Sequence, residues 1–392
     1  MKKRIGQLLL LAAFVMAFSM AMPVQQVFAS GNGEKGRTGS APAGGVQFKT
    51  AKKNGFVIGF ANGYIGNTWR AQFIDDIEKG AEKYKSSGVL KRIDIANSPA
   101  DVSQQLTQLN SLINSDIDAL MIDPVSPTSL GPIIQAAKAK GILVVITNDA
   151  AAYAGTYCFV GNNHPIWTIE PEWIAQKLNG KGDIVMVHGL PGNIGDQLRI
   201  DDATAVLKKY PNINVLASVP GKWSPSVAQQ EMTTILSTYK KIDAVLTQDV
   251  MPMGIIQAFA NAGRKPVLMT GDYTFDFLRK WKELGLDSIS ITYDPAYGFN
   301  ALGLTLRILQ GKALKDGVLQ ENPLDATLKN AILFDPAYVI TNEAQPNASW
   351  MKTLKFTEAI SLEQALKLGE GQPDNAAIDR VLSEEQMDSY FK

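Results

Sequence analysis

The chain has 392 residues, of which 45% are hydrophobic and 19% are charged. This composition is typical of a folded protein with more than one domain and excludes a disordered chain. Lysine plus arginine and aspartate plus glutamate number 38 each. Without net charge, neither nucleic acid nor an anionic membrane surface is expected as a partner.

The N-terminal segment has the three-part pattern of a secretory signal peptide. Basic residues at positions 2–4 precede an apolar run over residues 8–21, and a small-residue site ends at Ala29. The run is too short to favour a lasting membrane span, and a retained anchor is the alternative. We expect residues 1–29 to be cleaved near Ala29 and the mature protein to lie in the periplasm. Residues 30–54, rich in Gly, Ser, Lys and Ala, are expected to form a flexible leader.

From residue 56 onward, short β-rich runs alternate with longer segments of helical periodicity. The expected strands cover residues 56–61, 92–96, 119–123, 143–149, 183–188, 215–219, 244–249, 267–272 and 288–293. This alternation favours parallel sheets with right-handed crossovers, so the fold class is α/β. Ser98 and Ser224 each precede a proline and are expected to be helix N-caps.

Four elements recur in the same order in the two halves: an Ile-Asp-Ala strand start, an Ile-Ile-Gln-Ala segment, a glycine and a strand that ends in aspartate. The paired positions are 117–120 and 242–245, 133–136 and 255–258, Gly141 and Gly263, and Asp149 and Asp272. The repeat predicts two Rossmann-like lobes, each a parallel sheet flanked by helices, joined by a hinge. Convergent α/β composition is the alternative.

The order of these elements predicts the domain boundaries. The hinge is expected near Asn162 and Asp294. The N-terminal lobe is expected over residues 55–162 and 294–325, the C-terminal lobe over residues 163–293 and 326–345, and a C-terminal extension over residues 346–392. The sequence assigns no function to the extension.

Aspartates end or directly follow several of the expected strands: Asp123, Asp149, Asp249, Asp272 and Asp294. Open α/β sheets bind ligands at the carboxyl ends of their strands, and a carboxylate accepts several hydroxyl hydrogen bonds, as a polyol requires. Asp149 and Asp272 are equivalent in the repeat and are expected to face each other. Asp123 precedes Pro124 and is interpreted as a turn residue.

The first strand leads into a loop at residues 62–70 that contains Tyr, Trp, two Asn and Arg. An aromatic face can pack on the C–H face of a sugar, and Asn67 and Arg70 are expected to hydrogen-bond the hydroxyl groups of such a ligand. Trp223 offers a second aromatic group from the other lobe, or else packs on the helix that follows it. Arg199 follows a Gly-rich loop and is expected to reach the crevice, or else to lie on a helix surface.

Motifs for catalysis and for metal binding are missing from the sequence. With His164 and His188 as the only histidines, no metal, no cofactor and no enzymatic activity are expected. Glycoside hydrolysis by Asp149 and Asp272 is the alternative function. Cys158 is the single cysteine, and its apolar surroundings indicate a buried side chain.

Together these motifs resemble the periplasmic sugar-binding proteins of the ribose-binding type, the type I receptors of ATP-driven (ABC) importers. The resemblance covers residues 56–345 and rests on motifs at 67–70, 146–149, 192–199, 223–225, 248–254, 271–272 and 293–298. A repressor with this fold would carry a DNA-binding module ahead of the first lobe, where this chain has the signal peptide pattern and the leader.

The resemblance implies a monomer that binds a small sugar (pentose, hexose or furanose) between its lobes and delivers it to a membrane permease, with a chemoreceptor as a further candidate partner. The implied ligand contacts are Asn67, Trp69, Arg70, Asp149, Arg199, Trp223, Gln248, Asp249, Asp272 and Tyr293. The sequence departs from the family where Ala150 replaces the usual arginine and where Arg199 is shifted by one residue. The Trp69-Arg70 pair looks like that of galactofuranose receptors. A furanone, or a sugar acid paired with Arg70, is the alternative ligand.

Overall fold

The computed structural model describes residues 38–40, 47–49 and 54–392. The expected signal peptide lies outside these residues. Among the described residues, no helix is long and apolar enough to cross a membrane. Within the expected leader, β1 (Thr38–Ser40) pairs antiparallel with β2 (Gln47–Lys49), so the leader contains backbone structure that its composition did not predict.

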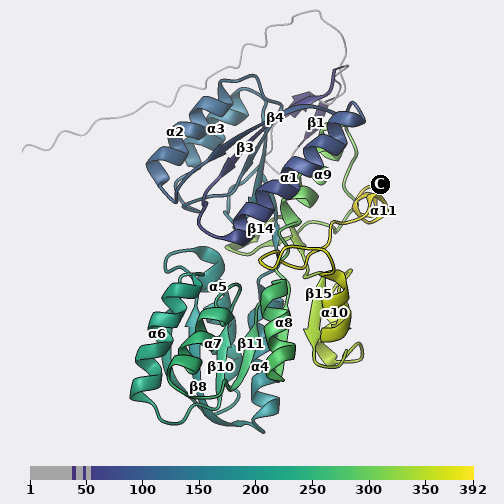
Figure 1. Ribbon diagram of the computed structural model, residues 1–392. Helices are drawn as coiled ribbons and strands as arrows, with labels where there is room; N and C mark the ends of the chain where they lie inside the picture. Colours follow the sequence, from purple (N-terminus) through teal and green to yellow (C-terminus); the bar gives the residue numbers. More distant parts are fainter. Residues whose placement is uncertain (1–37, 41–46, 50–53) are drawn as a thin grey trace, which may run out of the picture. The chain divides into compact units, whose positions relative to one another are not determined.

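The N-terminal lobe is built on a seven-stranded sheet of order β13-β14-β7-β6-β5-β3-β4. Figure 1 labels β3, β4 and β14 of this sheet. Its strands are β3 (Phe56–Asn62), β4 (Leu90–Asn97), β5 (Ala119–Ile122), β6 (Leu143–Asn148), β7 (Tyr157–Gly161), β13 (Gln320–Asn322) and β14 (Asp325–Phe334). All neighbouring pairs are parallel except β13 and β14.

Alternating residues of these strands pack on helices at the two faces of the sheet. Ile58 and Phe60 belong to the hydrophobic cluster that contains α1 (Thr68–Ser86) and α9 (Tyr297–Leu309). Val57 and Ala61 belong to the cluster that contains α2 (Val102–Ile113) and α3 (Gly131–Ala139). The sheet is therefore covered on both faces, and its loops at the carboxyl ends remain for binding.

The C-terminal lobe has a second seven-stranded sheet, of order β16-β15-β12-β11-β10-β8-β9. Its strands are β8 (Lys181–His188), β9 (Asn212–Pro220), β10 (Ala244–Thr247), β11 (Leu268–Gly271), β12 (Ser288–Ile291), β15 (Tyr338–Thr341) and β16 (Glu358–Ser361). Its main helices are α4 (His164–Lys177), α5 (Ile194–Leu207), α6 (Pro225–Thr238), α7 (Pro252–Asn261) and α8 (Phe275–Leu284). Every strand expected from the sequence occurs in one of the two sheets, and the α/β prediction with two lobes is confirmed.

The internal repeat corresponds to equivalent structure in the two lobes. Asp118 precedes β5, and its carboxylate accepts a 2.8 Å hydrogen bond from the backbone N–H of Val57. Asp243 precedes β10, and its carboxylate accepts a 2.8 Å bond from the backbone N–H of Asp183. Each aspartate therefore ties the start of a repeated strand to the neighbouring strand in the same way.

Two of the chain segments that pass between the lobes lie at the expected hinge residues. The backbone N–H of Asn162 donates to Phe334 O at 2.7 Å, and a carboxylate oxygen of Asp294 accepts from the backbone N–H of Ala337 at 2.9 Å. The expected boundary after residue 325 is wrong. Residues 331–334 of β14 pair with β7, so the N-terminal lobe extends to Phe334.

The segment 346–392 is part of both lobes rather than an appendage. It contributes β16 to the C-terminal sheet and continues through η1 (Ser349–Thr353), α10 (Leu362–Leu368) and α11 (Glu384–Asp388). The backbone oxygen of Ala376, in this segment, accepts a 3.0 Å hydrogen bond from the backbone N–H of Phe275 on α8 of the C-terminal lobe. Its side chains Glu384 and Asp388 form ion pairs with Arg307 on α9 of the other lobe.

One of the two expected N-caps is confirmed. The Ser224 hydroxyl caps α6, with Pro225 in the first turn. The other expectation is wrong, because α2 begins at Val102 and is capped by Asp101, whereas Ser98 bonds Asp101 in the preceding turn.

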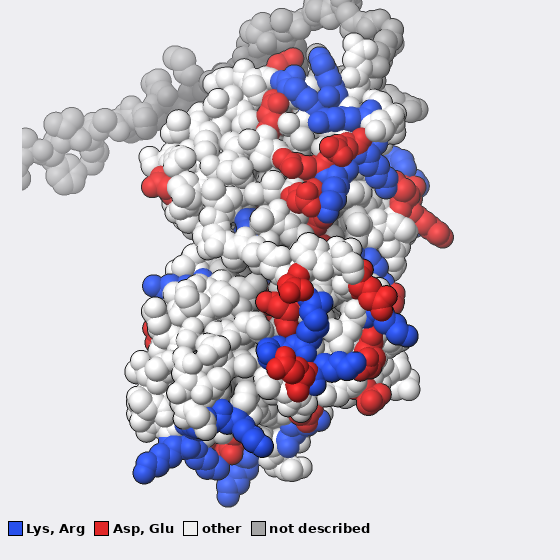
Figure 2. All heavy atoms as spheres, viewed as in Figure 1, with Lys and Arg blue, Asp and Glu red and all other residues white. Residues whose placement is uncertain are grey.

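On the surface, side chains of both charges lie side by side over α1 and α8 (Figure 2). One example is the ion pair between Lys79 and Asp75 on α1.

Candidate ligand-binding site

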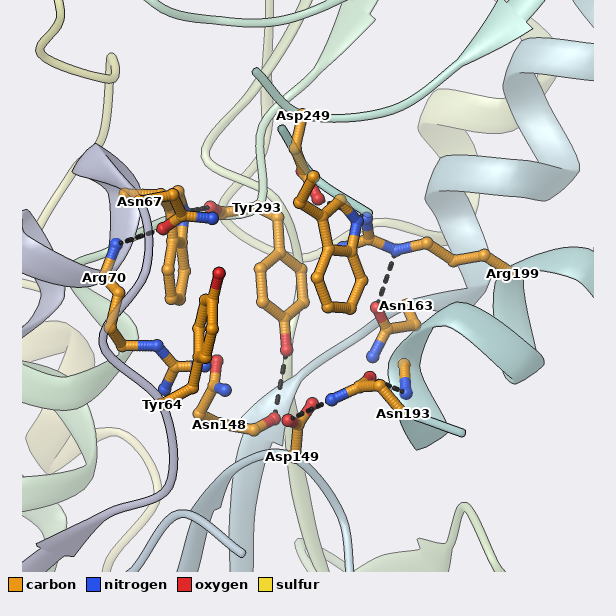
Figure 3. A pocket seen from close by; sticks show the side chains of 13 residues that line it. Tyr64, Asn67, Arg70, Asn148, Asp149, Asn163, Asn193, Arg199, Asp249 and Tyr293 are labelled. Atoms are coloured by element: carbon orange, nitrogen blue, oxygen red, sulfur yellow. Dashed lines mark hydrogen bonds and ion pairs between the residues drawn. The ribbon is translucent and has the colours of Figure 1, made fainter. Parts of the chain in front are cut away.

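A cavity lies between the lobes (Figure 3). It is lined by polar, charged and aromatic side chains from the strand ends and helix starts of both lobes. The lining residues are Tyr64, Asn67, Trp69, Arg70, Asn148, Asp149, Asn163, Asn193, Gly195, Arg199, Trp223, Asp249 and Tyr293.

The first turn of α1 forms one wall. The Asn67 side-chain oxygen caps the helix by accepting from the Arg70 backbone N–H at 2.9 Å. The Trp69 indole stacks on Phe73 with ring centroids 5.4 Å apart and donates to Tyr293 O at 2.6 Å. The Trp69 ring is therefore held in place by packing and by a hydrogen bond from its own chain.

Arg70 is held by a carboxylate that the sequence did not assign to the site. Asp123 is 1% exposed and forms an ion pair with the Arg70 guanidinium. It also accepts from Asn148 Nδ2 at 3.1 Å and from the Gly63 N–H at 3.2 Å. Its interpretation as a turn residue is incomplete, because it neutralises Arg70. Arg70 Nε and Asn148 Oδ1 are buried without a hydrogen-bond partner among the described residues.

Asp149 connects the two lobes across the cavity. Its carboxylate accepts a 2.8 Å hydrogen bond from Asn193 Nδ2, at the N-cap of α5 (Figure 3). Burial raises the pKa of Asp149 to about 6, and the nearby carboxylate of Asp123 acts in the same direction. The group is therefore poised to change its charge near neutral pH.

The opposite wall is organised by Arg199, which is 2% exposed. Its guanidinium donates to Asn163 Oδ1 at 2.9 Å, to Gln248 Oε1 at 2.7 Å and to Asp249 at 2.8 Å. It also lies 4.9 Å from the centroid of the Tyr293 ring, in cation–π range. This guanidinium, like that of Arg70, is neutralised by a carboxylate of its own chain.

Three non-glycine residues at the site have left-handed backbone conformations. The φ angles are 61° for Asn148, 51° for Trp223 and 49° for Asp249. Such conformations are costly for most residues and concentrate at functional sites. The Trp223 indole packs against Gly189, where an added Cβ would lie 2.2 Å from the ring.

Most of the expected ligand contacts line the cavity, but Gln248 and Asp272 do not. Gln248 lies behind the wall, bonded to Arg199 and Trp223. The Asp272 carboxylate accepts hydrogen bonds from the backbone N–H groups of Tyr273 and Thr274, at 2.7 and 3.2 Å. It therefore bonds the turn that starts α8 and not the cavity. The expectation that Asp149 and Asp272 face each other across the crevice is therefore wrong.

Several lining residues were absent from the expected set: Tyr64, Asn148, Asn163, Asn193 and Gly195. All five lie next to motifs that the sequence revealed, namely the aromatic loop, the strand end at Asp149, the hinge and the Gly-rich loop. An asparagine at the end of a strand, as at Asn148, or at a helix start, as at Asn163 and Asn193, is the signal that would have found three of them.

A polar and aromatic cavity between two doubly wound lobes defines a two-lobed binding protein. The family model described as "Periplasmic binding protein domain" matches residues 58–313. This match covers more than half of the chain, and the protein belongs to that family.

Named relatives and a solved structure agree with this assignment. The chain is 35% identical to the xylitol-binding protein of Mycolicibacterium smegmatis over 208 residues, which cover 51% of this chain and 58% of that protein. It is 29% identical to the D-allose-binding periplasmic protein of Escherichia coli over 63% of this chain and 83% of that protein. The crystal structure of an ABC transporter solute binding protein from Thermobispora bispora superposes with a TM-score of 0.66 at 26% identity, over 83% of this chain and 99% of that one.

Proposed function

We propose that this protein is the exported substrate-binding component of an ABC importer. It binds a small neutral sugar or polyol between its lobes and delivers it to a membrane permease, without making or breaking a bond in it. Relatives named for xylitol and D-allose support this class of ligand. The signal peptide pattern supports export to the periplasm.

The observation that carries the proposal is the pairing of both cavity guanidinium groups with internal carboxylates. Arg70 pairs with Asp123, and Arg199 pairs with Asp249. With the Asp149 carboxyl group added, carboxyl groups outnumber guanidinium groups at the site. An anionic ligand would meet repulsion from these carboxylates, whereas hydroxyl groups find donors and acceptors already oriented. This pairing disfavours the sugar acid that the sequence left as an alternative.

The aromatic side chains supply apolar contacts for the ligand beside the polar ones. Trp69 and Tyr293 approach within 5.6 Å between ring centroids, and Trp223 lines the cavity from the other lobe. Their faces suit the C–H surface of a sugar ring. A second hollow adjoins the cavity and shares five lining residues with it, and we infer that the ligand enters there. The shared residues are Tyr64, Arg70, Asp149, Asn193 and Trp223.

The structure gives no support to the glycosidase alternative. That hypothesis needs Asp272 opposite Asp149, and Asp272 is bonded within its own turn and does not line the cavity.

The test is to identify the ligand that copurifies with the mature protein. Gently purified protein is denatured, and the released compound is analysed by mass spectrometry, with protein stripped by guanidinium and refolded as the control. We expect a neutral pentose, hexose, furanose or polyol. Release of a carboxylated compound, or turnover of a glycoside by the protein, would contradict the proposal.

A further inference from the structure

The carboxamide of Gln248 is held in a single orientation from behind the cavity wall. Its Oε1 accepts from Arg199 Nη1 at 2.7 Å and from Trp223 Nε1 at 2.8 Å. Its Nε2 donates to Asp196 Oδ1 at 3.2 Å. A flipped amide would place its NH₂ group against two donors and its oxygen against a carboxylate, so the observed orientation is strongly preferred.

Asp196 is fixed in turn by the residues around it. It lies in the first turn of α5 and is 2% exposed. Its Oδ1 also accepts from the Gly189 N–H at 2.6 Å, and its Oδ2 lies 3.0 Å from Nδ1 of His188. The carboxylate thereby joins the end of β8, the start of α5 and the residue that follows β10.

We propose that Gln248 and Asp196 are positioning residues for ligand binding. Asp196 sets the orientation of the Gln248 amide, which holds the Trp223 indole and the Arg199 guanidinium at the cavity wall. Neither residue touches the ligand. This role rests on the proposed function of the cavity, and it differs from the direct ligand contact that family resemblance implies for Gln248.

The left-handed backbone at Trp223 explains why such support is needed. With a φ of 51° the residue occupies a conformation that other contacts have to maintain. Its indole N–H has Gln248 as its hydrogen-bond acceptor. Loss of that acceptor leaves a half-buried donor unpaired and frees the ring to move.

Two substitutions at Asp196 separate hydrogen bonding from charge. Asparagine can keep an oxygen toward Gly189 and Gln248 while its NH₂ group faces His188, so Asp196→Asn preserves the amide orientation. Asp196→Ala removes all of these bonds. The matched control is Asp202→Ala, because Asp202 lies on the same helix and also contacts a histidine, His164, at 3.0 Å, but on the exposed side.

The experiment measures, for each variant, the affinity for the best-binding neutral sugar and the fluorescence of Trp223. The Trp223 signal is taken as the difference between each protein and its Trp223→Phe derivative. We expect Asp196→Ala to weaken binding by about tenfold, as loss of one well-placed bond would. It should also change the Trp223 emission, while Asp196→Asn and Asp202→Ala stay close to wild type.

Unchanged affinity and emission in Asp196→Ala would overturn the proposal, as would an Asp196→Asn variant as weak as Asp196→Ala. The fluorescence measurement needs no ligand. If wild-type protein binds no sugar, the proposed function fails, while a shifted Trp223 emission in Asp196→Ala alone still supports the positioning role.

Discussion

Asp149 in the N-terminal lobe accepts a hydrogen bond from Asn193 in the C-terminal lobe, at 2.8 Å across the cavity. This bond exists only when the lobes approach each other, so it contributes to the arrangement that encloses a ligand. A two-lobed protein that closes by a hinge binds its ligand more tightly when the closed arrangement is favoured.

The first prediction concerns this bond. Asn193→Ala should weaken ligand binding by about tenfold, because a hydrogen bond to a charged group contributes about 1.5 kcal/mol or more. The measurement is calorimetric titration with the best-binding sugar. Asn214→Ala is the control, since Asn214 donates to Asp183 at 3.0 Å within one lobe, and its affinity should match wild type. Equal losses in both variants would refute the role of the interlobe bond.

The second prediction is a pH dependence of affinity. The pKa of Asp149 is raised by burial to about 6, and hydroxyl donors bind the ionised carboxylate. Affinity should therefore be constant above pH 7 and fall on acidification, by about tenfold at pH 5 where the free group is mostly protonated. Asp149→Asn should bind weakly at every pH, without this dependence. If the affinity of the wild-type protein is the same at pH 7 and pH 5, the predicted role of the Asp149 carboxylate is wrong.

Gly189 should be intolerant of any side chain. A Cβ there would lie 2.2 Å from the Trp223 ring, so Gly189→Ala displaces the indole and lowers affinity severalfold. Gly192→Ala makes a useful comparison for packing, since a Cβ at Gly192 meets no atom within 4 Å, although its φ of 87° adds backbone strain. Normal binding by Gly189→Ala would show that Trp223 is not part of the binding surface.

Asp272 should matter for stability more than for affinity. Its carboxylate bonds the backbone at the start of α8, as a capping residue does. Loss of such a cap costs about 1 kcal/mol. Asp272→Ala should lower the melting temperature by about 2 °C, while the affinity changes less than about threefold because the carboxylate does not line the cavity. A large affinity loss with an unchanged melting temperature would restore the direct contact expected from the sequence.

The C-terminal segment should make folding stability depend on pH. Burial raises the pKa of Asp379 to about 8, with a further increase from Asp76 on α1 and a smaller one from Asp294, while a bond from Gln72 opposes it. Burial also raises the pKa of Asp76, although Lys79 opposes that increase. The folded protein thus holds protons that the unfolded chain releases, so this contribution to stability is present at low pH and is lost as pH rises from about 4 toward 8. The melting temperature should fall over that range, and less so in Asp379→Asn; identical profiles would contradict this.

The sequence predicts the fold well because each lobe repeats local signals. Buried strands, glycine at helix ends and the Ile-Asp-Ala starts are all read from neighbouring residues, and the repeated aspartates Asp118 and Asp243 occupy equivalent positions. The boundary at Phe334 was missed because β14 reads as exposed and polar in its first half, whereas its pairing with β7 is a long-range contact.

The candidate cavity lies where the sequence predicted a site, but the partners of its side chains were not predicted. The residue types that follow the strands suggested Asp149, Arg70 and Trp223, and all three line the cavity. Whether a carboxylate faces the cavity depends on which donors compete for it. Asp272 hydrogen-bonds the backbone of its own turn, and Asp123 forms an ion pair with Arg70 on α1. Gln248 likewise has both ends of its amide occupied. Such competition is decided by three-dimensional packing, which spacing along the chain does not encode.

The most direct test of the central claim is calorimetric titration of ligand-free protein with matched pairs of neutral sugars and their uronic acids, such as galactose with galacturonic acid and glucose with glucuronic acid. Because Arg70 and Arg199 are already paired with carboxylates, we expect one or more neutral sugars or polyols to bind at micromolar concentration or below and the acids to bind far more weakly. Tighter binding of an acid than of its neutral partner, or no binding by any neutral compound, would contradict the account.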